Sequence, residues 1–185
     1  MKKFSIMSHS KGFMLTELMV VLALLGIVLA LGYMFYGFGT RAFSTGEKRA
    51  IAQQSVRTGA DFITRQIRFA DELTLDPSGE TIGYYYIYQD GNSVHYKYID
   101  PDGSDDIDRV LLDSAADEIG YAVSFDAIET SSPAYALLVT FTITAEDIYS
   151  LSTDVYIMNI TKSDNYTDNS SLGTSVSAVE FKKPN

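Results

Sequence analysis

The fold of this protein is decided near its N-terminus by 23 consecutive residues without a charged side chain, LMVVLALLGIVLALGYMFYGFGT at positions 18–40. The run is apolar on every side, whereas a helix buried in a small soluble domain is shorter and keeps a polar face. Roughly 20 such residues cross a hydrocarbon core of about 30 Å. A secretory signal peptide fits less well, because its apolar region is only about 7–15 residues long and ends at small residues. Aromatic residues suited to a membrane interface end this run, namely Tyr33, Phe35, Tyr36 and Phe38. The run therefore predicts a transmembrane helix.

Charge is distributed unevenly along the 185 residues. Residues 1–12 carry three lysines and no acid, residues 41–68 carry six basic and two acidic side chains, and residues 71–185 carry 21 acidic and five basic ones. The N-terminal lysines favour a cytoplasmic N-terminus and an extracytoplasmic C-terminal part, while the basic residues behind the apolar run weaken this orientation. The acidic C-terminal part argues against nucleic-acid binding over most of the surface, since phosphates require a basic face.

The composition also limits the chemistry that the chain can perform. It has no Cys and only two His, His9 and His95, so disulfides, thiolate metal sites, a cysteine nucleophile and a multi-histidine metal site are excluded. A serine nucleophile needs an activating base, and His95 is the only candidate behind the apolar run. We therefore do not expect an enzyme, and we expect no cofactor.

Glu17 stands directly before the apolar run and does not suit a plain anchor. A carboxylate within the hydrocarbon region is costly and usually marks a site that pairs with another group. Alternatively, Glu17 lies at the cytoplasmic interface and pairs with Lys11.

The stretch KGFMLTEL at Lys11–Leu18, followed by the apolar run, resembles the N-terminus of type IV prepilins and type II secretion pseudopilins. The resemblance implies that residues 1–12 are a leader removed by a prepilin peptidase after Gly12. It also implies that Phe13 becomes the N-methylated mature N-terminus and that Glu17, as the fifth mature residue, is the assembly residue. Later parts of the chain are similar to minor pilins and J-type minor pseudopilins.

Each of these roles has a physical reason. Gly12 has no side chain to keep a protease from the scissile backbone. Cleavage leaves a cationic amine on Phe13, and the Glu17 carboxylate of a neighbouring subunit would pair with it strongly in a low dielectric. Such a pair would set the axial register between subunits. One departure concerns the helix itself, because many relatives carry a proline beyond Gly26, whereas no proline precedes Pro77 here.

The resemblance implies a structural subunit, more plausibly a minor than a main one, of a type IV pilus or of a secretion or competence pseudopilus. Its partners would be other pilin subunits, the peptidase and methylase, an inner-membrane assembly platform and membrane lipid. It would reside in the cytoplasmic membrane, crossing once, before entering the fibre. Two alternatives remain: a membrane-anchored extracytoplasmic binding module that is not assembled into a fibre, and an anchored hydrolase, which the poor set of catalytic groups disfavours.

Behind the transmembrane half of the helix, residues 13–40, the pattern becomes amphipathic. Residues 41–75 are expected to form its second half, ending near residue 73, because small and apolar side chains recur every three or four positions: Ala52, Val56, Gly59, Ile63, Ile67, Ala70 and Leu73. Residues 76–160 show short alternating runs that predict an antiparallel β head, at 81–89, 93–99, 109–112, 121–128, 135–144 and 151–160. Residues 161–185 are polar and read as a flexible tail or as a last strand at 175–181. The fold class is α+β, and the resemblance supplies the pilin arrangement of a long helix on a sheet.

Few other residues suggest a ligand site. Five carboxylates fall within nine residues, which suits calcium, but the spacing of an EF-hand is not met and a solvated acidic turn is the simpler interpretation: Asp100, Asp102, Asp105, Asp106 and Asp108. His95 reads as a cross-strand residue. The tyrosines at 84–86 and 88 could form an adhesive surface. Alternation, however, places Tyr84, Tyr86 and Tyr88 on one face of a strand and Tyr85 on the other, so at least one of these two sets is expected to pack in the core.

Overall fold

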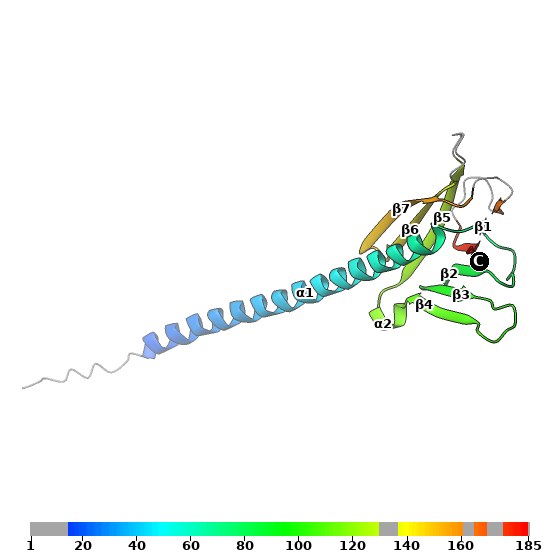
Figure 1. Cartoon of the computed structure of the whole chain (residues 1–185). Coiled ribbons are helices and arrows are strands. Elements are labelled where there is room, and N and C mark those ends of the chain that lie inside the picture. The colour runs from blue at the N-terminus through cyan, green and yellow to red at the C-terminus, as the bar shows by residue number, and fades with distance from the viewer. Residues whose placement is uncertain (1–14, 130–136, 161–164, 170–175, 185) are drawn as a thin grey trace, which may run out of the picture. The chain divides into compact units, whose positions relative to one another are not determined.

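A computed structural model describes residues 15–129, 137–160, 165–169 and 176–184 of the chain (Figure 1). The chain divides into two units, which meet between Gly46 and Glu47. The helix α1, Leu15–Ile67, begins in the first unit and ends in the second. The second unit contains all the strands and is called the head below.

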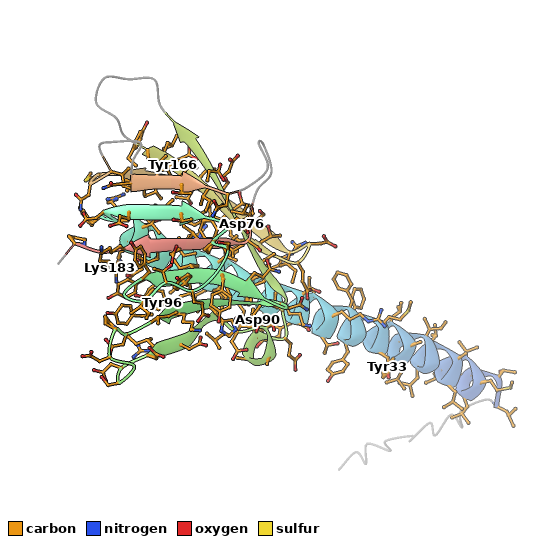
Figure 2. All side chains as sticks on the ribbon, turned by 90° about the vertical axis from the view of Figure 1, so that its right-hand side faces the viewer. Tyr33, Asp76, Asp90, Tyr96, Tyr166 and Lys183 are labelled. Atoms are coloured by element: carbon orange, nitrogen blue, oxygen red, sulfur yellow. The ribbon has the colours of Figure 1, made fainter. Side chains whose placement is uncertain are left out.

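The six-stranded sheet of the head combines segments that are far apart in the sequence. Its strands are β1 (Glu72–Leu75), β2 (Tyr85–Asp90), β3 (Ser93–Tyr98), β4 (Ile107–Leu112), β8 (Tyr166–Asp168) and β9 (Ala178–Lys182). They lie side by side in the order β4-β3-β2-β9-β1-β8, with β8 in orange and β9 in red in Figure 2. All neighbouring pairs are antiparallel except β1 and β8, which are parallel.

A second sheet has three antiparallel strands in the order β5-β6-β7. These are β5 (Tyr121–Glu129), β6 (Leu137–Ala145) and β7 (Tyr149–Ile157). The predicted alternation on β6 is confirmed, since Leu137, Val139, Phe141, Ile143 and Ala145 are all buried. A short helix α2, Ser114–Asp117, precedes β5 and is capped by Asp113, whose Oδ1 accepts hydrogen bonds from Ala115 N (2.9 Å) and Ala116 N (3.4 Å).

The second half of α1 supplies one wall of the core. Its buried residues recur at three- and four-residue spacing, as the amphipathic pattern predicts: Ala52, Val56, Gly59, Ala60, Ile63 and Ile67. At Gly59 the helix approaches β4 closely, because a Cβ there would lie 3.1 Å from Cδ2 of Leu112. The two sheets contribute the other buried apolar side chains, among them Phe125, Phe141 and Phe181.

The helix ends earlier than expected, at Ile67 rather than near residue 73. Ala70 and Leu73 are buried as the pattern predicts, but they lie beyond the helix, and Leu73 belongs to β1. The amide of Asp71 donates to Lys182 O at 2.9 Å, so the backbone here pairs with β9 instead of continuing the helix. The expected helix over 41–75 is therefore wrong at its C-terminal end.

The head contains two sheets instead of the single antiparallel sheet that was expected. All six expected strands and the last strand are present with shifted ends, whereas β1, β8 and α2 were not predicted. The two sheets are joined through Phe125 of β5 and Val176, which exchange backbone hydrogen bonds of 2.7 and 2.9 Å. The tail interpretation of 161–185 is wrong for β9, since Val179 and Phe181 are fully buried in the middle of the larger sheet.

Candidate functional site

The first half of α1 is the most conspicuous surface of the chain. Its large apolar side chains are exposed: 53% for Leu18, 64% for Leu29 and 74% for Phe35. By length and composition this helix could cross a membrane, and none of its most apolar stretch is buried within the chain. Exposed apolar area costs about 25 cal/mol per Å², so such a surface needs lipid or other apolar helices around it.

The helix is regular throughout the apolar run. It continues without interruption through Gly26 and Gly32, and a Cβ added at either glycine would meet no atom within 4 Å. These glycines are therefore not required for packing within the chain. Each lowers the helix propensity by roughly 1 kcal/mol relative to Ala, as Gly37 and Gly39 of the same run also do, so these positions are weak points of the segment.

Glu17 lies in the first turn of α1 and is exposed. A carboxylate is favourable there because the first backbone N–H groups of a helix carry partial positive charge. From residue 15 onward, Glu17 makes no ion pair with any described basic residue. Lys11, Gly12 and Phe13 lie outside the described residues.

The carboxylates of the acidic turn between β3 and β4 do not converge on one point among the described residues. Asp100 Oδ2 accepts hydrogen bonds from Ser104 Oγ (3.2 Å) and N (3.3 Å), and Asp106 Oδ1 accepts one from Asp100 N (2.8 Å). Asp102 and Asp105 are exposed, and Asp108 instead lies beside His95, with Oδ1 and Nδ1 3.4 Å apart. Within the described residues, no three carboxylate or imidazole groups converge as a metal ion would require.

His95 and the tyrosine cluster have packing roles. His95 is a cross-strand residue, as expected, and its ring stacks on Tyr88 with 5.4 Å between centroids. Tyr85 stacks on Tyr98 at 4.4 Å and on Phe181 at 5.6 Å. Tyr86 is only 5% exposed, so both faces of β2 contain packed tyrosines.

Two tyrosine hydroxyls bind carboxylates on the same face of the large sheet. The Tyr84 hydroxyl donates to Glu72, and this hydrogen bond, followed by burial, raises the pKa of Tyr84 to about 12. The same bond is the main cause of a lowered pKa for Glu72, to which Lys182 Nζ also donates at 3.1 Å. Tyr86 donates in the same way to Glu180, the one buried charged residue of the described chain.

Lys183, which the sequence did not single out, lies among aromatic rings. Its Nζ is 4.0 Å from the centroid of the Tyr85 ring and donates to the Tyr96 hydroxyl at 3.2 Å. Burial lowers the pKa of Lys183. No motif could have revealed this arrangement, because residue 183 falls in a segment that looks like a polar tail.

Two shallow clefts lie beside the head half of α1. One, of about 440 Å³, is lined by Ile51, Gln54, Ser55, Thr58, Leu111, Leu112, Asp113 and Asp117. In it Ser55 Oγ donates to Asp117 Oδ2 at 2.9 Å, and the same carboxylate oxygen accepts a bond from Tyr121 at 2.5 Å. The other, of about 320 Å³, is mostly apolar and lies between Phe62 and Gln66 of α1 and the edge strand β4.

The chain resembles known proteins in its N-terminal sequence and in its fold. The family described as the prokaryotic N-terminal methylation motif matches residues 7–33, which include Gly12, Phe13 and Glu17. The solved PilB minor pilin from Streptococcus sanguinis is similar in structure, with a TM-score of 0.58 and 14% identity over 74% of this chain and 35% of that chain. The D319A mutant of that pilin gives a TM-score of 0.54 and 15% identity over 73% and 34% of the two chains.

The chain thus spans about a third of the length of these solved pilins. No curated protein sequence matches it significantly. The predicted α+β class, a long N-terminal helix with an antiparallel head, is confirmed by the helix, the sheets and this likeness. The chain is therefore pilin-like, with a prokaryotic N-terminal methylation motif at residues 7–33 and a fold similar to that of a minor pilin.

Proposed function

We propose that this chain is a structural subunit of a type IV pilus or related pseudopilus, assembled through its N-terminal helix. The observation that carries the proposal is the exposed apolar half of α1, most of which falls within the match to the N-terminal methylation motif. In a membrane, lipid acyl chains would cover this surface. In a fibre, the same surface of neighbouring subunits would cover it, so a single segment would serve both as anchor and as assembly interface.

In this proposal, residues 1–12 are removed as a leader and Phe13 becomes the methylated N-terminus. The new cationic amine would then meet Glu17 of a neighbouring subunit. Among the residues described from 15 onward, no basic side chain pairs with Glu17, which is compatible with a partner on a neighbouring subunit. Because either charge alone is costly among apolar helices, the pair would fix the register between subunits while the apolar surfaces supply the adhesion.

The orientation follows from the same proposal. The N-terminus would face the cytoplasm and the acidic head would lie outside the membrane, with other pilin subunits, a prepilin peptidase and an assembly platform as partners. A minor rather than a main subunit is favoured by the likeness to a minor pilin. The head would be structural and would perform no chemistry of its own.

Processing can be tested by intact mass and N-terminal sequencing of the protein extracted from membranes. Loss of residues 1–12 together with a gain of about 14 Da on Phe13 would support the proposal, because methylation adds one carbon and two hydrogens. A mature chain that begins at Met1 would refute it and would favour an anchored binding module.

Assembly can be tested with Glu17→Ala. The variant should insert into the membrane as the wild type does but should be depleted from sheared surface fibres. Glu47→Ala is the matched control, since Glu47 is also an exposed glutamate of α1 but lies in the head unit. If Glu17→Ala enters fibres at the wild-type level, the pairing argument fails.

A further inference from the structure

The side of α1 that points away from the core of the head is basic. Arg57, Asp61 and Arg65 of the helix, and Arg68 directly behind it, are all exposed and lie off the side that carries the buried residues. Arg65 pairs with Asp61 on the same helix, and no described acidic residue forms an ion pair with Arg57 or Arg68. These four residues, called the basic face below, are three arginines and one aspartate, so their net charge is +2.

The helix dipole accounts for only part of this charge. Arg65 and Arg68 lie at the C-terminal end of α1, where cations stabilise a helix. Arg57 lies roughly three turns before that end, beyond the reach of this effect. The rest of the head is rich in acids, with 21 acidic and five basic side chains in residues 71–185, yet none of those described pairs with Arg57.

The three-stranded sheet has an acidic outer face. Its inner face is buried in the core, and its outer face carries the alternate residues of β5, β6 and β7. There Asp126 and Asp154, both exposed, stand on either side of Thr140 in one row across the strands. The other described residues of the outer face carry a hydroxyl group or are apolar, so the net charge of this face is −2.

This outer face is regular and its side chains are held in place. The pairing of β6 with β5 and with β7 continues without a bulge. The Thr140 hydroxyl donates to Asp154 Oδ1 at 2.8 Å, and in the next row the Thr142 hydroxyl donates to Ser152 Oγ at 3.1 Å. Because Asp154 is already ordered, it loses little further entropy when it meets a cation.

The two faces match in charge and in spacing. Arg57 and Arg65 are separated by about 12 Å along the helix axis, and Asp126 and Asp154, two strand spacings apart, by about 10 Å. Since arginine side chains are long, two of them can reach both carboxylates at once. Within one head the faces cannot meet, because α1 and the inner face of the sheet both line the core and their other sides point away from it.

We propose that the basic face of one copy of this chain binds the outer face of the three-stranded sheet of a second copy, with arginines on Asp126 and Asp154. Two different surfaces meet in this contact, so each bound copy still offers one surface of each kind and the contact can extend into a row instead of closing on a pair. It involves the heads alone. The proposed assembly through the apolar half of α1 therefore stands or fails independently of it.

The test uses chemical cross-linking of the full chain in detergent micelles, which is clean because the chain has no Cys. Thr58→Cys places one thiol on an exposed helix position between Arg57 and Arg65, and Thr142→Cys places one on the central strand of the acidic face. The two variants carry tags of different size, are mixed and are treated with a short bismaleimide. The mixed dimer should clearly exceed the homodimer of either variant, and added salt should lower its yield.

Charge reversal tests the role of the arginines. Arg57→Glu, added to the Thr58→Cys variant, should lower the yield of the mixed dimer about five-fold, as expected when an exposed ion pair is replaced by like charges. Arg109→Glu is the matched control, since Arg109 is also an exposed arginine of the head without a described ion pair but lies on β4. It should leave the yield unchanged.

A charge swap separates pairing from any loss of folding. Arg57→Glu with Arg65→Glu on one partner should nearly abolish the mixed dimer, and Asp126→Lys with Asp154→Lys on the other partner should restore it. The proposal is overturned if the mixed dimer does not exceed the homodimers, if Arg57→Glu has no effect, or if the swap does not restore the yield. A mixed dimer that forms only in the absence of phosphatidylglycerol in the micelles would assign the arginines to lipid phosphates and would overturn the proposal as well.

Discussion

Replacing Ile63 by alanine should lower the free energy of unfolding of the head by about 3 kcal/mol. Ile63 is fully buried on the face of α1 that packs on the sheets. The change removes three carbon atoms, worth about 0.8 kcal/mol each in transfer free energy. The cavity left behind brings such losses to about 2–5 kcal/mol, and the better helix propensity of alanine returns about 0.4 kcal/mol.

The measurement is thermal unfolding of the full chain in detergent, followed by near-UV circular dichroism of the head tyrosines. A loss of this size should lower the melting temperature by about 6–12 °C. Gln53→Ala, on an exposed position of the same helix, should change the stability by no more than about 0.5 kcal/mol. A loss below about 1 kcal/mol for Ile63→Ala, or an equal loss for Gln53→Ala, would refute the assignment of this helix face to the core.

Three other predictions concern the stability of the head. Phe181→Ala should cost about 3–5 kcal/mol in denaturant unfolding, because this ring is fully buried in the central strand β9, and a loss under about 1 kcal/mol would contradict that placement. Gly59→Val should destabilise the head by about 1–3 kcal/mol, since a Cβ there would lie 3.1 Å from the leucine it faces, whereas Gly26→Val, with no atom within 4 Å, should not change the head's melting temperature. The pKa of Tyr84 is raised from 10.0 to about 12, so the protonated Tyr84 hydroxyl stabilises the head fully below pH 10 and this contribution is lost as the pH rises through 12. Between those pH values, the melting temperature should therefore decrease less steeply with pH for Tyr84→Phe than for the wild type. An equal slope would count against the hydrogen bond to the carboxylate.

The sequence was most informative where a pattern is long and local. The 23 uncharged residues predicted a helix by their length alone. The stripe from Ala52 to Ile67 and the alternation on β6 each repeat with the period of one element, so they predicted the packed face of the helix and a strand. The N-terminal motif was recognisable for the same reason, because its residues are adjacent.

Features that depend on partners distant in sequence could not be predicted. The end of α1 is set by the pairing of Asp71 with Lys182, which are 111 positions apart. β1 and β8 have only four and three residues, too few to show a period. The contacts of Lys183 with Tyr85 and Tyr96 need β2, β3 and the end of β9 in one place, and only the sheet order brings them together.

The position of β9 between β2 and β1 has a consequence for biosynthesis. These two strands emerge from the ribosome early, yet neither can find its central neighbour until residues 178–182 have been made. The head must therefore wait, with two sheet edges open, for almost the whole of its translation.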